Sequence, residues 1–120
     1  MAKARSLGAM VELLFVCGVL LMVVAGLLPW LLGPRIVMAG EIVDGPDPTW
    51  PAISRSVRTP EQGRAAVAAS IRDGSDFIKV YNGLSRESYL AIVDEAKRRH
   101  LDVVGHVPFA ITAADAAEAG

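Results

Sequence analysis

An uncharged run at residues 13–34 constrains the fold of this chain more than any other feature. The run reads LLFVCGVLLMVVAGLLPWLLGP and contains no Asp, Glu, Lys or Arg. A helix needs about 20 apolar residues to cross the hydrocarbon core of a bilayer. A helix that is apolar on every side belongs in a membrane or deep inside a large protein. We therefore predict that residues 1–33 form a hydrophobic N-terminal segment with a single transmembrane helix.

Charges on either side of this run predict its orientation. Lys3 and Arg5 precede it, whereas the acidic residues Glu41, Asp44 and Asp47 follow it. Basic residues are enriched on the cytoplasmic side of a membrane. We therefore expect a single-pass membrane protein with a cytoplasmic N-terminus.

Two alternatives stay open for the hydrophobic segment. A secretory signal peptide has the same basic start, although this apolar run is longer than usual and no clear A-x-A-like cleavage site follows it. Alternatively, residues 1–31 are an out-of-register translation product, in a truncated or frame-disturbed reading without function. Under these alternatives we expect a cytoplasmic or periplasmic protein.

The composition of the whole chain excludes several classes of protein. Twelve basic and thirteen acidic residues give a net charge of -1, without the basic excess of a nucleic-acid-binding protein. Cys17 is the single cysteine, which excludes a disulfide scaffold and a Cys-rich zinc module. The 120 residues suit one small domain and fall far short of the roughly 250 residues of a complete (β/α)₈ barrel.

Residues 34–120 alternate strand and helix signals and form the second predicted domain. Short runs rich in β-branched residues predict strands within residues 35–43, 76–81 and 101–107, the first at Ile36 and Val37 and ending at Gly40. Residues 44–60 contain four prolines and are expected to be an extended loop without an element of its own. Three strand–helix units predict an α/β fold with a parallel sheet.

Each predicted helix starts at a hydroxyl-bearing capping residue, namely Thr59, Ser85 or Thr112. Gln62 completes a capping box with Thr59, and this first helix is expected to stop at Gly74. The second helix carries an apolar stripe at positions i, i+3, i+4 and i+7. The stripe consists of Tyr89, Ile92, Val93 and Ala96.

Alternation along two predicted strands places a lysine and a histidine on one side of the sheet. In DFIKVY, Ile78 and Val80 form the face that suits helix packing, so Lys79 and Tyr81 point the other way. In LDVVGHV, His106 lies near the carboxyl end of its strand. Ligands of parallel α/β folds bind at the carboxyl ends of strands. Lys79 and His106 therefore form a candidate site, with a solvated edge lysine and a hydrogen-bonded structural histidine as the competing interpretation.

Residues 32–120 resemble the amidohydrolase superfamily, in its imidazolonepropionase- and prolidase-like branch of metal-dependent hydrolases. The resemblance rests on DFIKVY, a helix and then VVGHV, together with LGPRIVMAG and DGPDPTWP. It implies a partial (β/α)₈ TIM barrel of about three βα units. It also implies hydrolysis of C–N bonds in amide, peptide-like or cyclic amide substrates.

The resemblance assigns roles to two residues. Lys79 matches a lysine that is often carboxylated and bridges divalent ions, commonly zinc, and His106 matches a histidine metal ligand. Strand alternation alone places Tyr81 near enough to line the substrate pocket. The family's paired histidines on its first strand have no counterpart, since His100 is the only other histidine, so no catalytic residue is assigned.

Three interpretations of function follow from these observations. The first is a fragment of a metal-dependent amidohydrolase that is not catalytically complete alone. The second is a membrane-anchored, non-catalytic α/β interaction module. The third is the truncated or frame-disturbed reading. In the first two, a second copy or a partner chain is expected to cover the open edges of the sheet.

Overall fold

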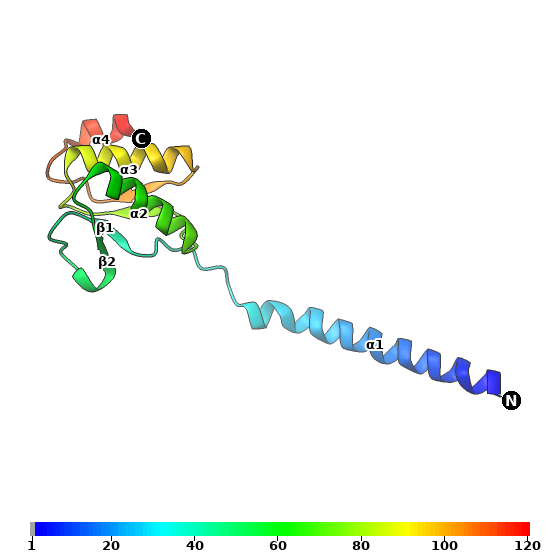
Figure 1. Ribbon diagram of the computed structural model, residues 1–120. Helices are drawn as coiled ribbons and strands as arrows, with labels where there is room; N and C mark the ends of the chain where they lie inside the picture. The colour runs from blue at the N-terminus through cyan, green and yellow to red at the C-terminus, as the bar shows by residue number, and fades with distance from the viewer. Residues whose placement is uncertain (1) are drawn as a thin grey trace. The chain divides into compact units, whose positions relative to one another are not determined.

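The computed structural model describes the chain from residue 2 to residue 120, with the side chains of residues 8–28 and 33–120 (Figure 1). The described residues fall into two compact units, which meet between Ile36 and Val37 along the chain. The first unit contains one long helix. The second unit contains a parallel sheet with its helices, and each unit is described by itself.

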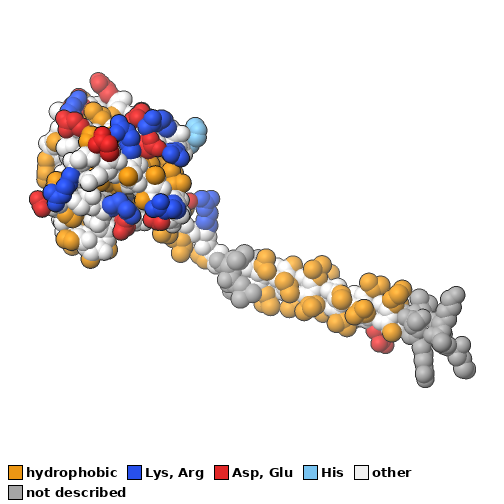
Figure 2. Space-filling view, in the orientation of Figure 1, with side chains coloured by type: hydrophobic (Ala, Val, Ile, Leu, Met, Phe, Trp, Pro, Cys, Tyr) orange, Lys and Arg blue, Asp and Glu red, His pale blue; other side chains and the backbone are white. Residues whose placement is uncertain are grey.

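Helix α1, Ala2–Leu32, is the hydrophobic N-terminal helix that the sequence predicts. Its stretch from Gly8 to Leu28 is long and apolar enough to cross a membrane, and none of that stretch is buried. Figure 2 shows hydrophobic side chains along this stretch. Glu12 is the only charged residue between Gly8 and Leu28, so this stretch has no polar face. The helix ends next to Gly33, whose φ of 65° is a left-handed conformation that suits glycine.

The second unit is an α/β fold with four strands in the order β2-β1-β3-β4, all parallel. Helices α2, α3 and α4 lie together on one side of this sheet (Figure 1). The strands are β1 (Ile42–Asp44), β2 (Ser54–Ser56), β3 (Ile78–Val80) and β4 (Val103–Gly105), and the helices are the 3₁₀ turn η1 (Pro51–Ile53), α2 (Pro60–Arg72), α3 (Arg86–Arg98) and α4 (Ala113–Ala119).

Two predictions about the first part of this unit were wrong. The first strand is Ile42–Asp44, whereas Ile36 and Val37 lie before it and are exposed. Ile36-Val37 and Ile42-Val43 are both β-branched pairs. Only Val43 pairs with Val80 of β3 and enters the core. The proline-rich segment also contains two elements, η1 and β2, where a loop without elements was predicted. The unit therefore has four strands instead of three.

The core lies between the sheet and the helices. Strand residues Val43, Ile78 and Val80 pack against Val67 of α2 and Ile92 of α3, and all five are 2% exposed or less. Burial of such side chains contributes about 1.5–3 kcal/mol each. The predicted stripe of α3 is confirmed, since Tyr89, Ile92, Val93 and Ala96 are all buried.

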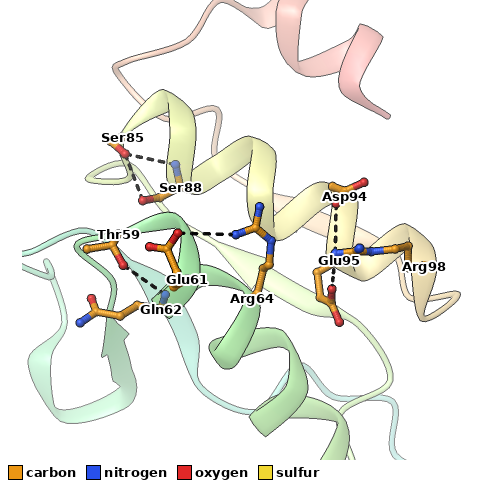
Figure 3. Close-up of polar contacts among 9 residues, drawn as sticks. All are labelled: Thr59, Glu61, Gln62, Arg64, Ser85, Ser88, Asp94, Glu95 and Arg98. Carbon is orange, nitrogen blue, oxygen red and sulfur yellow. Dashed lines mark hydrogen bonds and ion pairs between the residues drawn. The ribbon is translucent and has the colours of Figure 1, made fainter.

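The predicted capping residues are confirmed, whereas the capping box predicted for Thr59 and Gln62 is only half formed. The Thr59 hydroxyl accepts a hydrogen bond from the Gln62 N–H at 3.3 Å, and the Ser85 hydroxyl accepts one from the Ser88 N–H at 3.2 Å (Figure 3). The Gln62 side chain accepts from the N–H of Arg58 at 2.8 Å, one residue earlier than a capping box requires. These bonds satisfy N–H groups that a helix leaves open at its first turn.

Candidate functional site

The register of β3 and β4 decides which side chains share the open face of the sheet, the face opposite the helices. Lys79 pairs with Val104, between the pairs Ile78–Val103 and Val80–Gly105. Because Ile78 and Val80 are buried against the helices, Lys79 and Val104 point to the open face. Val104 is 41% exposed and Lys79 is half-buried.

Tyr81 and His106 follow these residues by two positions and lie on the same open face. Their ring centroids are 4.4 Å apart, with an angle of 66° between the ring planes. The N–H of Tyr81 donates to the carbonyl of Val43 at 3.0 Å, and the N–H of His106 donates to the carbonyl of Val80 at 3.2 Å. These two bonds tie the backbone of both residues to the last paired positions of the sheet and place them at its carboxyl edge.

The three candidate site residues from the sequence analysis therefore lie on the same face of the sheet. Lys79, Tyr81 and His106 lie on one face, next to the carboxyl ends of neighbouring parallel strands, where ligands of α/β folds bind. Lys79 is half-buried within the second unit. The other histidine, His100, is exposed after the end of α3 with a φ of 58° and takes no part.

Asp44 is the residue at this edge that the sequence reasoning missed. It is the last residue of β1 and is fully buried. Its carboxylate accepts hydrogen bonds from the N–H groups of Gly45, Thr49 and Gly83. The Asp44-Gly45 pair directly after a β-branched run was the available signal, since Asp and Gly mark a tight turn.

The loops at this edge also enclose a pocket of about 290 Å³. Its wall includes Pro46 after β1, Val57 and Arg58 after β2, and Leu84 after β3. Phe109, which follows β4 and is 87% exposed, lines it as well.

A complete zinc site is not present among residues 2–120. The described residues contain no group of three His, Cys, Asp or Glu side chains that could hold a metal ion. Structural and catalytic zinc ions take at least three protein ligands. His106 offers one donor, Lys79 could offer a second only after carboxylation, and the buried Asp44 carboxylate accepts three backbone N–H bonds. These residues therefore fit only part of a metal site.

The clearest pKa shifts lie away from the open face. Hydrogen bonding to Arg99, with Arg98 nearby, lowers the pKa of Glu95 on α3 (Figure 3 shows Glu95 with Arg98). Hydrogen bonding to Arg86 likewise lowers the pKa of Asp115 on α4. Such shifts mark ion pairs that hold the helices and not a reactive centre.

Comparisons with known proteins found structural relatives. No protein-family model matches the chain, and no curated protein matches it. Among solved structures, the chain is similar to the bottromycin amidohydrolase, with 35% sequence identity and a TM-score of 0.59 over 65% of this chain and 18% of that chain. It is also similar to a protein described as uncharacterized, with 27% identity and a TM-score of 0.53 over 62% of this chain and 26% of that chain. The match thus spans about a fifth to a quarter of these longer proteins.

Proposed function

We propose that residues 37–120 form part of a (β/α)₈ barrel of a metal-dependent amidohydrolase, which hydrolyses C–N bonds in amide, peptide-like or cyclic amide substrates. One observation carries the proposal. A parallel sheet with its helices on one side presents Lys79, Tyr81 and His106 on the other, and 65% of the chain is similar to part of the bottromycin amidohydrolase. In a closed barrel, the face opposite the helices is the interior.

In this proposal the chain supplies only part of the metal site. His106 donates an imidazole nitrogen, and Lys79 becomes a ligand after carboxylation, because an ammonium group has no lone pair to donate. Tyr81 lines the substrate pocket beside His106. The remaining ligands come from further segments or from a partner chain, so the chain alone is expected not to catalyse hydrolysis.

A chimera tests this proposal. Residues 37–120 replace the segment that they match in the bottromycin amidohydrolase, and the purified chimera is analysed for zinc content and for hydrolysis of that enzyme's substrate. We expect the chimera to bind zinc. Lys79→Ala and His106→Ala in the chimera should each lower the zinc content, because each removes one ligand.

The matched control is His100→Ala, which removes the exposed histidine of the same segment and should leave the zinc content unchanged. A folded chimera that holds the same zinc with and without Lys79 and His106 would overturn the proposal. So would a folded chimera in which His100→Ala has the larger effect.

A second candidate function is a membrane-anchored α/β module without catalytic activity. Two observations favour it: α1 is exposed and apolar from Gly8 to Leu28, and no complete metal-ligand group occurs among the described residues. In this proposal α1 crosses the membrane once with its N-terminus in the cytoplasm, and the open sheet edges bind a partner chain.

Alkaline carbonate extraction of membranes tests the anchor. We expect the chain to stay in the pellet until detergent is added. Gly18→Asp and Val19→Asp together put two charges at the centre of α1 and should move the chain to the supernatant, because each charge costs several kcal/mol in the bilayer core. Release of the unmodified chain by carbonate would contradict an integral anchor.

A further inference from the structure

Asp44 is unusual among the carboxylates described in this chain. Its exposure is 0%, although a buried charge is costly unless hydrogen bonds satisfy it. Oδ1 accepts from the N–H of Gly45 and from the N–H of Gly83, both at 2.8 Å, and Oδ2 accepts from the N–H of Thr49 at 3.0 Å. Three backbone donors therefore surround one carboxylate.

These bonds join two loops that are far apart in the sequence. Gly45 and Thr49 belong to the loop after β1, whereas Gly83 belongs to the loop after β3, 39 residues from Asp44. The two loops touch through their backbones, because a Cβ atom built on Gly45 would lie 1.8 Å from the carbonyl oxygen of Gly83. A side chain at Gly45 would force the loops apart.

The loop after β3 is held from both sides. On one side, Tyr81 donates its N–H to Val43, and Gly83 donates its N–H to Asp44. On the other side, the carbonyl of Asn82 accepts from the N–H of Phe109 after β4, at 3.1 Å. Of these three hydrogen bonds, only the one between Gly83 and Asp44 involves a side chain. Gly83 lies two residues after Tyr81, whose ring contacts His106.

We propose that Asp44 is a positioning residue for the open-face site. Its carboxylate fixes the loop after β3 to the end of β1 and thereby holds Tyr81 in place against His106. The proposed role of Asp44 is to position the loop and not to bind a metal, since its buried carboxylate already accepts three backbone N–H bonds. That this positioning serves substrate binding rests on the function proposed above. That Asp44 holds the two loops together does not depend on that function.

Amide hydrogen exchange of the full chain in detergent micelles tests the proposal. Asp44→Ala removes all three bonds and should speed exchange at Gly45, Thr49 and Gly83 by about tenfold or more, since hydrogen bonds to a charged group are stronger than those between neutral groups. The Tyr81–His106 ring contact, followed by NOEs between the two rings, should weaken in the same variant.

Asp44→Asn should change the exchange rate at one of the three amides and not at the other two. A general loss of stability would speed exchange at all three. The side-chain carbonyl oxygen of this variant still accepts from Gly83, but its NH₂ group now faces the N–H of Thr49. We expect faster exchange at Thr49 alone, with Gly83 and the ring contact close to those of the unmodified chain. The matched control is Asp47→Ala, an exposed aspartate of the same loop, which should change none of these signals.

The proposal is overturned if Gly83 exchanges at the same rate in Asp44→Ala as in the unmodified chain, or if the ring contact persists there at full strength. If Asp44→Ala does not fold, Asp44→Asn decides, and an unchanged exchange rate at Thr49 overturns the proposal. Neither measurement needs metal or substrate. The result for Asp44 can therefore be interpreted even if the amidohydrolase proposal fails.

Discussion

The rings of Tyr81 and His106 meet edge to face, with their centroids 4.4 Å apart, at the carboxyl ends of two neighbouring parallel strands. The contact brings together the residues that directly follow β3 and β4. It also places the only described histidine of the sheet beside a phenol on the open face. Lys79 lies two positions earlier on the same face.

Replacing Tyr81 by Leu should lower the free energy of unfolding by about 1 kcal/mol, because an aromatic pair contributes about 0.5–1.5 kcal/mol beyond its buried area. The imidazole protons of His106 should also shift in the NMR spectrum when the neighbouring ring is removed. Phe109→Leu is the matched control. Phe109 is 87% exposed, so its change should stay within about 0.5 kcal/mol. Unchanged His106 signals in Tyr81→Leu would contradict the ring contact.

Ile92→Ala tests the core between the sheet and the helices. Ile92 has no exposed surface and belongs to the core cluster with Val67 and Ile78. The variant should lose about 2–5 kcal/mol in urea unfolding, from lost burial and the cavity left behind. Ile53→Ala, at a site that is 56% exposed, should cost clearly less. Equal losses at the two sites would show that the helices do not pack on the sheet as described.

Thr59→Ala and Ser85→Ala should each lower the stability by about 1 kcal/mol, because each removes the hydroxyl that caps the first turn of a helix. Circular dichroism during chemical unfolding measures the loss. Thr59→Ser keeps the hydroxyl and should retain most of the stability. An alanine variant as stable as its serine counterpart would rule out the capping role of Thr59.

The stability of the second unit should fall in acid. Hydrogen bonding to Arg99 holds the pKa of Glu95 below its ordinary value of 4.5. A carboxyl group with a lowered pKa in the folded state contributes stability above its unfolded pKa and loses that contribution as the pH falls through the folded pKa. Glu95→Gln should therefore flatten the decline of stability below about pH 4.5.

Glu118→Gln, which removes an exposed carboxylate from α4, serves as the control for this pH dependence. Thermal unfolding at a series of pH values from 7 to 3 gives the comparison. If the stability of the Glu95→Gln variant declined in acid as much as that of the unmodified chain, the ion pairs of Glu95 with Arg98 and Arg99 would not contribute to stability.

Local sequence patterns carry enough information to predict α1, the helix starts and the face of Lys79. Apolar residues on all sides define α1, hydroxyl residues define the first turns, and strand alternation separates Lys79 from Ile78 and Val80. Each of these features depends on residues within a few positions of one another, so a short stretch of sequence is enough to predict it. The structure confirms all three.

Other features depend on contacts between distant residues. Ser54–Ser56 is polar and follows three prolines, so only its pairing with β1 makes it a strand. The site at Ile36 and Val37 is as β-branched as that at Ile42 and Val43, and the partner Val80 decides between them. The role of Asp44 depends on Gly83, which lies 39 residues away. No local pattern contains these pairings.

The central claim is that positions 79 and 106 face the same side of the sheet, close enough to share one ligand. Lys79→His tests this claim through Ni²⁺ binding, measured by titration calorimetry of the full chain in detergent. Two imidazoles on one face should bind Ni²⁺ at least about tenfold more tightly than one, because the second contact is intramolecular. Lys79→His combined with His106→Ala should remove the gain. Equal Ni²⁺ affinity with and without His106 would contradict the claim.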